Sequence, residues 1–222
     1  MDLENSKSIV WKRRPFVIAI YDPNWFLKVL GYLRKRGLYF LIYENADKIP
    51  YFSVLYTDYY LFVQEVSIRN DVLVMYDPEH NCISLEKAIL KTRFKERYEH
   101  VTVGIDPGSI ATYVVIGDDE LIDYGKVEPD KLKDEILEKL QCIPYRETVV
   151  RIGGGVDGWR LALNLKNRLR VRVEVVDEEE TSGLTKLESI LIKNKFLPSR
   201  NIRIDKDLYA AIRIALRKGM IV

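Results

Sequence analysis

Three groups of acidic residues lie at positions where a globular chain rarely needs charge. Asp106 ends an apolar run within the stretch GIDPG at 104–108, the run DEEE at 177–180 follows another apolar run, and Asp205 and Asp207 open a helix-like segment. Carboxylates that gather raise one another's pKa unless a cation neutralises them. Oxygen ligands suit Mg²⁺ or Mn²⁺, and a pair of such ions can activate water for phosphodiester hydrolysis. These residue types therefore predict a divalent metal site.

Each acidic group also has an ordinary explanation. Asp followed by Pro-Gly is common in turns, and an acidic run is typical of a solvated loop. Asp205 or Asp207 at a helix start would serve as an N-cap that complements the helix dipole. Their order along the chain favours a site, because parallel strands end at one edge of a sheet and ligands bind at that edge.

The second half of the chain shows the elements that must position these acids. Apolar runs predict three consecutive antiparallel strands, at 101–105, 113–117 and 121–127, and two further strands at 148–152 and 171–176. Helical spacing predicts helices at 131–140, 159–169, 184–195 and 207–218. The expected order is β-β-β-α-β-α-β-α-α, with the first, fourth and fifth strands parallel.

The sequence of the first half of the chain predicts a separate small α/β domain over residues 1–95. Strand-like runs occur at 16–20, 38–43, 53–56, 60–63 and 72–75, with helices at 24–36 and 84–92. The charged stretch KTRFKERYEH at 91–100 predicts a linker or a solvated helix end. The fold class expected is thus α/β, a mixed sheet with helices on both faces over residues 100–222 preceded by the small domain.

This arrangement resembles the RNase H-like fold, and in particular the RuvC/YqgF group of Holliday-junction resolvase-like nucleases. GIDPG is similar to the signature first strand of RuvC-type resolvases. VDEEETS at 176–182 is similar to the acidic motif after the last strand of YqgF-type proteins, and DLYAAI at 207–212 to the helix that supplies the last acid in both. The resemblance covers about residues 100–220.

The resemblance implies a metal-dependent endonuclease, a hydrolase that uses two Mg²⁺ or Mn²⁺ ions on branched DNA or structured RNA. Asp106, Glu178 and Asp207 would be the catalytic, metal-binding carboxylates, and Asp205 a further metal ligand. The sequence leaves open which acid of 177–180 points inward, and which of Asp205 and Asp207 is the ligand. A homodimer would suit the two-fold symmetry of a four-way DNA junction.

One departure supports a different function. The fourth strand reads TVVRI, with Arg151 where RuvC-type resolvases carry an acid. The alternative is therefore a non-catalytic nucleic-acid-binding or scaffold protein that keeps the fold. A nucleotide-binding relative of actin and sugar kinases ranks last, because the chain lacks a second copy of the motif.

The basic stretch at 151–172, which has no acidic residue from Gly158 onward, predicts contact with nucleic acid. Glycines before a helix let backbone N–H groups approach a phosphate, and the helix start adds its positive end. The residues expected to bind are Arg151, Gly153, Gly154, Gly155, Arg160, Lys166 and Arg168. The ordinary explanation is a tight strand-to-helix turn followed by a solvated helix face.

Composition narrows the remaining classes of protein. With a net charge of +2, the whole molecule does not strongly attract polyanions, so its global charge says little about its partners. The longest apolar runs are the length of strands, so no membrane span is expected, and the polar start does not resemble a signal peptide. Cys82 and Cys142 are expected to be free thiols of a cytoplasmic protein, with a disulfide as the alternative.

Overall fold

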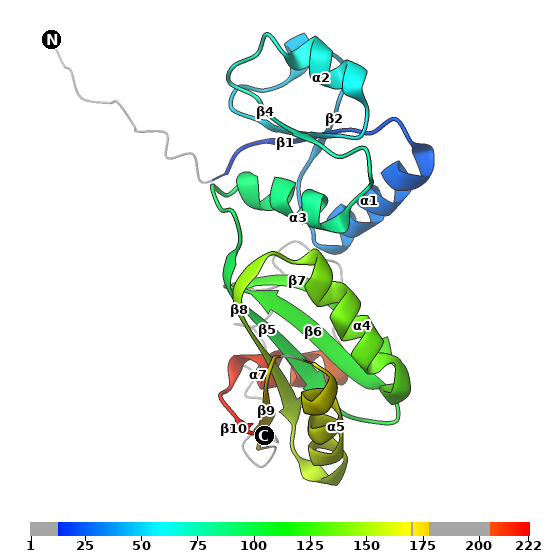
Figure 1. The fold of residues 1–222 in the computed structure, drawn as a ribbon, viewed down its shortest axis with the longest axis vertical. Helices are drawn as coiled ribbons and strands as arrows, with labels where there is room; N and C mark the ends of the chain where they lie inside the picture. The colour runs from blue at the N-terminus through cyan, green and yellow to red at the C-terminus, as the bar shows by residue number, and fades with distance from the viewer. Residues whose placement is uncertain (1–12, 170, 178–204) are drawn as a thin grey trace, which may run out of the picture. The chain divides into compact units, whose positions relative to one another are not determined.

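The computed structural model describes residues 13–169, 171–177 and 205–222 (Figure 1). The chain divides into two compact units. One, the N-terminal unit, comprises residues up to Leu27 together with Tyr39–Glu96, and the other, the C-terminal unit, comprises Lys28–Leu38 and Arg97–Val222. No helix within the described residues is both long and apolar enough to cross a membrane.

The N-terminal unit is built on a four-stranded, fully parallel sheet in the order β2-β1-β3-β4. Its strands are β1 (Phe16–Ala19), β2 (Leu41–Ile42), β3 (Val54–Thr57) and β4 (Leu73–Tyr76). Its helices are the start of α1 (Pro23–Lys35), whose residues from Lys28 onward belong to the other unit, and α2 (Tyr60–Val66) and α3 (Cys82–Lys91), with a 3₁₀ turn at Ala46–Lys48. The central strands β1 and β3 are buried throughout, as continuous apolar runs in a parallel sheet should be.

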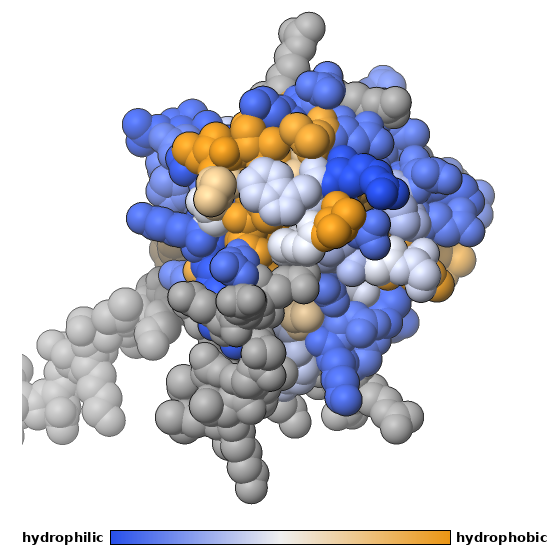
Figure 2. All heavy atoms as spheres, turned by 90° about the horizontal axis from the view of Figure 1, so that it is seen from below, coloured by the Kyte–Doolittle hydropathy of each residue, from blue (hydrophilic) through white to orange (hydrophobic). Residues whose placement is uncertain are grey.

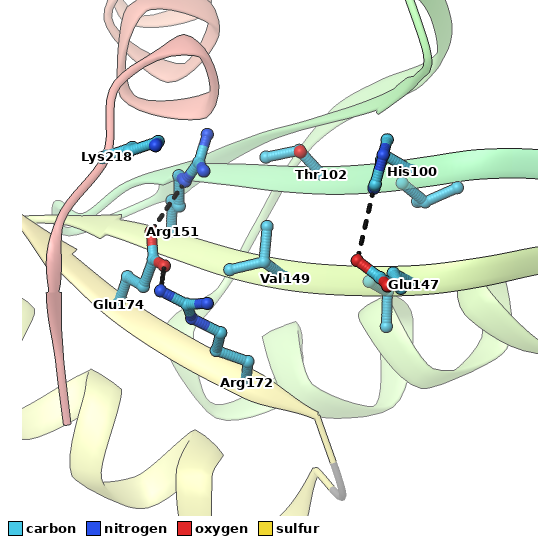
Figure 3. Close-up of a pocket in the computed structure, with 10 residues that line it drawn as sticks. His100, Thr102, Glu147, Val149, Arg151, Arg172, Glu174 and Lys218 are labelled. Atoms are coloured by element: carbon cyan, nitrogen blue, oxygen red, sulfur yellow. Dashed lines mark hydrogen bonds and ion pairs between the residues drawn. The ribbon is translucent and has the colours of Figure 1, made fainter.

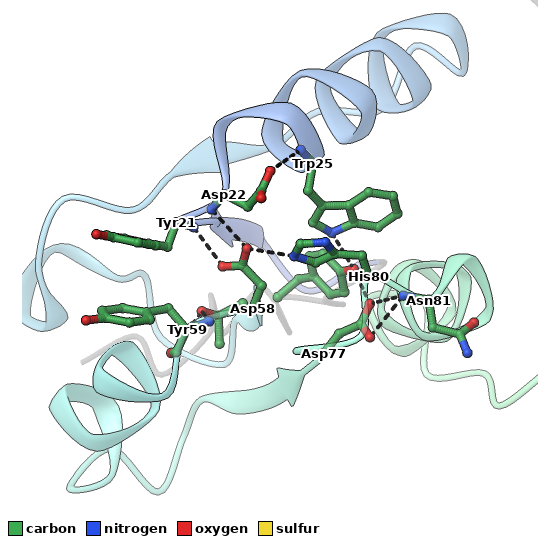
Figure 4. Close-up of polar contacts among 10 residues, drawn as sticks. Tyr21, Asp22, Trp25, Asp58, Tyr59, Asp77, His80 and Asn81 are labelled. Atoms are coloured by element: carbon green, nitrogen blue, oxygen red, sulfur yellow. Dashed lines mark hydrogen bonds and ion pairs between the residues drawn. The ribbon is translucent and has the colours of Figure 1, made fainter.

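Buried carboxylates tie the strand ends of this unit together (Figure 4). The strand order reverses between β1 and β3, a point where parallel sheets commonly open a crevice. Here Asp58, which follows β3, accepts hydrogen bonds from the backbone N–H groups of Tyr21 at 2.7 Å and Asp22 at 3.0 Å, which follow β1. His80 lies 3.1 Å from the same carboxylate. Asp58 therefore holds the ends of the two central strands together.

A second buried carboxylate, that of Asp77, ties the end of β4 to its neighbouring elements. Asp77 accepts the backbone N–H of Asn81 at the start of α3 and the hydroxyl of Tyr56 at 2.5 Å. Tyr56 in turn accepts the indole N–H of Trp25 at 3.1 Å. The chain from Trp25 to Asp77 thus connects α1, β3 and α3, which explains why an acid is tolerated at 3% exposure.

The C-terminal unit contains a six-stranded mixed sheet in the order β10-β9-β8-β5-β6-β7. Its strands are β5 (Tyr98–Asp106), β6 (Ala111–Gly117), β7 (Glu120–Val127), β8 (Tyr145–Gly153), β9 (Arg172–Val176) and β10 (Met220–Ile221). Strands β5, β6 and β7 form an antiparallel meander, and β8 and β9 run parallel to β5. The predicted fold class, a small α/β domain followed by a mixed sheet with helices on both faces, is confirmed.

Helices cover both faces of the mixed sheet (Figure 1). The helices α4 (Pro129–Cys142) and α5 (Gly155–Arg168) lie on one face, and α7 (Lys206–Leu216) lies on the other. On the α4 face, the Tyr113 hydroxyl donates to the Glu135 carboxylate at 2.6 Å. Burial and this contact with Glu135 raise the pKa of Tyr113 well above its usual range, so the hydroxyl remains the donor.

Gly104 sets how closely α7 approaches the sheet. A Cβ at this position would lie 2.3 Å from the carbonyl oxygen of Ala211 and 2.6 Å from the Cβ of Ala215, both in α7. On either side of this contact, α7 buries Leu208 and Ile212 against the meander. The glycine of GIDPG is therefore needed because a helix backbone occupies the space of its side chain.

Two local expectations are wrong. Residues 60–63 were expected to form a strand from their aromatic and β-branched character, but they begin α2, which packs Phe62 and Val66 against one face of the parallel sheet. Burial against the sheet decides the conformation of this short run over its intrinsic preference. Cys82 and Cys142 were expected to be free thiols, whereas both are disulfide-bonded.

The contact at Gly104 predicts that a single added methyl group lowers the free energy of unfolding strongly. We expect Gly104→Ala to lower the free energy of unfolding by about 2–3 kcal/mol, because backbone atoms of α7 must move to admit the Cβ. The matched control is Gly31→Ala in α1, where a Cβ would meet nothing within 4 Å. There alanine should raise stability by about 0.5–1 kcal/mol. Urea unfolding of both variants measures the difference, and equal stabilities would contradict the packing described.

Candidate functional site

Asp106 shares one row of side chains with two residues of the neighbouring strands. It is the last residue of β5 and pairs with Thr112 of β6, which pairs in turn with Lys126 of β7. Directly paired residues of antiparallel strands project from the same face of a sheet. This face carries α7, because Val114, two residues after Thr112, belongs to the core cluster that α7 completes. The row therefore runs along the sheet beside the start of α7.

The start of α7 adds two carboxylates to this row. The Lys126 ammonium lies 2.7 Å from Oδ2 of Asp205 and 2.6 Å from Oδ2 of Asp207. Hydrogen bonds to Asp205 and Asp207 raise the pKa of Lys126 to about 12, so it is charged throughout the physiological range. The three side chains are about half exposed, which leaves them accessible to a ligand from solvent.

Asp205 and Asp207 play different parts in the helix. Asp205 is the N-cap, and its Oδ1 accepts the backbone N–H of Leu208 at 2.9 Å. The hydrogen bonds from Lys126 and from this N–H hold the pKa of the Asp205 carboxyl below its usual value. Asp207 lies in the first turn and faces Lys126 without a capping contact of its own. Asp207 is therefore freer than Asp205 to move toward a ligand.

The acids supply the donors that a hard divalent ion prefers, but not a complete set. Asp106, Asp205 and Asp207 offer carboxylate oxygens only, which suits Mg²⁺ or Mn²⁺ and excludes a zinc preference. Glu178, the remaining predicted ligand, lies outside the described residues. Across the part of the chain that the structure describes, no three His, Cys, Asp or Glu side chains gather closely enough to hold a metal ion.

Arg151 lies in an internal network at the other end of α7 (Figure 3). Its Nε donates to Oε2 of Glu174 at 2.9 Å, and its Nη1 donates to the carbonyl oxygen of Ala215 at 2.6 Å. Arg172 adds a 2.6 Å contact to Glu174, and the backbone N–H of Gly219 adds one at 3.2 Å. Arg151 thus joins β8 to β9 and to the end of α7. Its predicted role as a phosphate contact stays a prediction.

Glu174 is an acid buried inside this network, with a side chain only 2% exposed. Burial alone would raise the pKa of the Glu174 carboxyl. The hydrogen bonds from Arg151 and Gly219, and the charges of Arg151 and Arg172, outweigh burial and hold the pKa below its usual value. The network borders a pocket of about 270 Å³, whose lining includes His100, Thr102 and Lys218.

The predicted glycine turn forms the link between β8 and α5. Gly153 and Gly154 are buried, and Gly155 has a φ of 84°, a left-handed conformation that favours glycine. Gly158 packs so closely on the turn that a Cβ there would lie 1.9 Å from the carbonyl oxygen of Gly153. The glycines therefore meet the structural needs of a tight turn, and their contact with phosphate stays a prediction.

The basic residues of α5 are positioned differently from one another. Arg160 is exposed and lines a pocket of about 500 Å³ together with Pro107, Gly108 and Ser109, the loop that follows Asp106. Lys166 is exposed two turns further along the helix, and the side chain of Arg168 lies outside the described residues. Arg160 is thus the predicted phosphate contact that lies beside the loop of Asp106.

α5 also exposes an apolar stripe, formed by Val156, Trp159 and Leu163. Trp159 lines a further pocket of about 630 Å³ with Met220 of β10. Figure 2 shows apolar side chains gathered on one face of the molecule, between hydrophilic neighbours. The sequence predicted basic residues on the surface of α5, and the helix exposes this apolar stripe as well.

Sequence reasoning missed Lys126 and Thr112. Lys126 belongs to the segment YGKVEP and looks like any exposed lysine near a strand end. The only available signal was register: residues opposite Asp106 in a three-stranded meander must share its face. That signal requires the β6–β7 pairing, which contains an irregularity between Val115 and Ile116 that periodicity cannot locate.

Comparisons with known proteins find similarity among solved structures. No family model and no curated protein matches the chain. Among solved structures, it is similar to Thermus thermophilus RuvC in complex with a Holliday junction substrate, at 16% identity over 53% of this chain and 91% of that one, with a TM-score of 0.40.

A second similarity is to Marinitoga piezophila Argonaute in complex with a 5′ OH guide RNA. It has 9% identity and a TM-score of 0.30, and it covers 75% of this chain. The chain spans only 40% of that Argonaute. The proposed function therefore rests on the residues of the site.

The Arg151 network predicts that removal of one charged partner lowers the free energy of unfolding. Arg151→Met should lower the free energy of unfolding by about 3–5 kcal/mol, because it leaves Glu174 buried without its charge partner. The control is Arg146→Met in the same strand, whose pair with Glu99 is exposed and should contribute less than about 1 kcal/mol. Denaturant unfolding measures both changes.

The same network predicts a dependence on acid pH. The pKa of Glu174 is lower in the folded state than in the unfolded chain, so its stabilisation is present above the unfolded value and is lost as pH falls through the folded one. Wild type should therefore lose stability below about pH 4 more steeply than Glu174→Gln. Parallel pH profiles of the two proteins would contradict this assignment.

Proposed function

We propose that the C-terminal unit is a metal-dependent nuclease that hydrolyses phosphodiester bonds in structured nucleic acid, either branched DNA or RNA. The observation that most supports the proposal is that Asp106, at the end of β5, lies in one row of the sheet with Lys126, which binds the acids at the start of α7. These two segments are far apart in the sequence.

The residues that would hold a divalent ion are Asp106, Asp207 and Glu178, with Asp205 beside them. A bound Mg²⁺ or Mn²⁺ would supply an activated water and charge neutralisation at the phosphate. The chain's own contribution is positioning. Pro107 and Gly108 end β5 directly after Asp106, so its carboxylate stands at the strand end, and the cap at Asp205 fixes the first turn of α7.

Nucleic acid would be held by the basic residues near this edge. Arg160 shares a pocket with the loop that follows Asp106, on the side of the sheet that α4 and α5 cover. Arginine recognises phosphate through two parallel N–H donors, so one residue can orient the backbone. The charge of the remaining exposed residues of α5, such as Lys166, would contribute without sequence preference.

A non-catalytic binding protein is the second candidate, and one observation favours it. The Lys126 ammonium already pairs with both Asp205 and Asp207. An ammonium at that place could preserve the fold of an acidic site after catalysis is lost. This candidate would bind nucleic acid in a salt-dependent manner and cleave none, with or without metal.

The nuclease proposal predicts a loss of cleavage in two variants. Asp106→Asn and Asp207→Asn should each reduce Mn²⁺-dependent cleavage of labelled four-way junctions, flaps or structured RNA at least about a hundredfold, because each removes a charged ligand. Asp134→Asn is the control, since Asp134 is an exposed acid of α4. Unchanged cleavage in Asp106→Asn would reject the site, and no cleavage by wild type on any substrate would favour the binding protein.

The position of Arg160 predicts that its side chain contributes to the affinity for nucleic acid. With cleavage blocked by EDTA, Arg160→Ala should weaken binding to labelled junction DNA and reduce the slope of log affinity against log salt by about 1. The control is Arg146→Ala, an exposed arginine that pairs with Glu99 near the start of β8. Equal salt slopes for wild type and Arg160→Ala would show that Arg160 makes no phosphate contact.

A further inference from the structure

We propose that the pocket beside Arg151 binds a phosphate group, either free phosphate or the terminal phosphate of a nucleic-acid strand. The pocket has a volume of about 270 Å³ and is lined by residues of β5, β8, β9 and the segment after α7 (Figure 3). It lies apart from Asp106, which is four residues beyond the lining residue Thr102 in β5, roughly 13 Å along the strand. The site therefore goes beyond the proposed nuclease function and does not require cleavage.

Three cationic side chains lie around one buried carboxylate at this pocket. Nε of Arg151 lies 2.9 Å from Oε2 of Glu174, and Nη2 of Arg172 lies 2.6 Å from its Oε1. Lys218 directly precedes Gly219, whose backbone N–H donates to the same carboxylate at 3.2 Å. All three cations line the pocket. The carboxylate of Glu174 thus gathers more positive charge than it can balance.

The excess of positive charge sets the charge of the ligand. The other acid that lines the pocket, Glu147, lies four residues from Arg151 along β8, roughly 13 Å away, and contacts His100 at 3.5 Å. Three positive charges against the one of Glu174 leave two to be neutralised. A phosphate monoester carries about −1.5 to −2 at pH 7, whereas a phosphate within a strand carries a single charge. The excess therefore favours a free or terminal phosphate.

The cations retain hydrogen-bond donors for such a ligand. Arg172 is 56% exposed, and a guanidinium carries five N–H donors, so its contact with Glu174 through Nη2 leaves others available. Lys218 is exposed and forms no ion pair with the residues that the structure describes. Thr102 adds a hydroxyl to the lining. Charged N–H donors bind phosphate oxygens through short, strong hydrogen bonds, which this combination can supply.

The volume of the pocket limits how much of a ligand can enter. It lies below about 300 Å³, the lower end for pockets that enclose a drug-sized molecule. A water molecule takes about 30 Å³, so the pocket admits a phosphate together with several waters. A nucleoside attached to that phosphate would remain outside. The site would therefore recognise the phosphate and accept a strand end without preference for its base.

The first test measures thermal unfolding of the full chain against the concentration of sodium phosphate, with NaCl at equal ionic strength as the reference. A ligand that binds the folded state raises Tm with its concentration, which gives its dissociation constant. We expect Lys218→Met and Arg172→Met each to weaken phosphate binding about tenfold, because each removes a charged donor. The control is Lys131→Met, since Lys131 is an exposed lysine of α4 that pairs with Glu128.

The variants separate specific binding from a general effect of salt. Phosphate also stabilises proteins because it is excluded from their surface, so the readout is the difference between wild type and Lys218→Met. An equal rise in Tm for wild type, Lys218→Met and Lys131→Met would overturn the site. Lys218→Met keeps the contact between Arg151 and Glu174, so it decides the question even if Arg172→Met unfolds. None of these results bears on the nuclease proposal.

A second measurement distinguishes the two sources of phosphate. Fluorescence anisotropy in EDTA compares single-stranded oligonucleotides that carry a phosphate at the 5′ end, at the 3′ end or at neither. Binding about tenfold tighter for a phosphorylated strand, lost in Lys218→Met, would assign the site to a strand end. Equal affinities for the three strands, together with the specific rise in Tm, would assign it to free phosphate.

Discussion

The close contact between α7 and β5 is the constraint on which the site depends. At Gly104 the backbone of α7 occupies the volume of a side chain, so the helix lies directly on the strand. Because α7 is fixed there, its first turn must lie over the end of the meander. The acids at 205 and 207 therefore reach the row of Asp106 through packing, and no long flexible side chain is needed to bring them together.

Cations from the sheet hold α7 at both ends. Lys126 of β7 binds the acids of its first turn, and Arg151 of β8 binds the carbonyl oxygen of Ala215 in its last turn. Acids at the start and a cation at the end both complement the helix dipole. Where the resemblance to RuvC-type resolvases would imply an acid in the fourth strand, this chain has Arg151. Its contact with α7 gives this departure a structural reason.

Much of the fold could be predicted from the sequence, because long apolar runs and helical periods mark most elements of the C-terminal unit. The position of Asp106 at a strand end and of Asp205 and Asp207 at a helix start followed from the same patterns. Lys126 and Thr112 could not be predicted, since their place beside Asp106 depends on the pairing of three strands. The run at 60–63 was misjudged, because packing on the parallel sheet outweighs the preference of its residues for strands.

The motif GIDPG combines two requirements that are usually separate. Gly104 and Asp106 are two residues apart in one strand, so they face the same side of the sheet. The glycine admits the helix, and the aspartate ends the strand on the face that the helix covers. A larger residue at 104 would move α7 away and separate Asp106 from Asp207 without touching either acid. In this motif Gly104 packs against α7, and Asp106 ends the strand on the same face of the sheet.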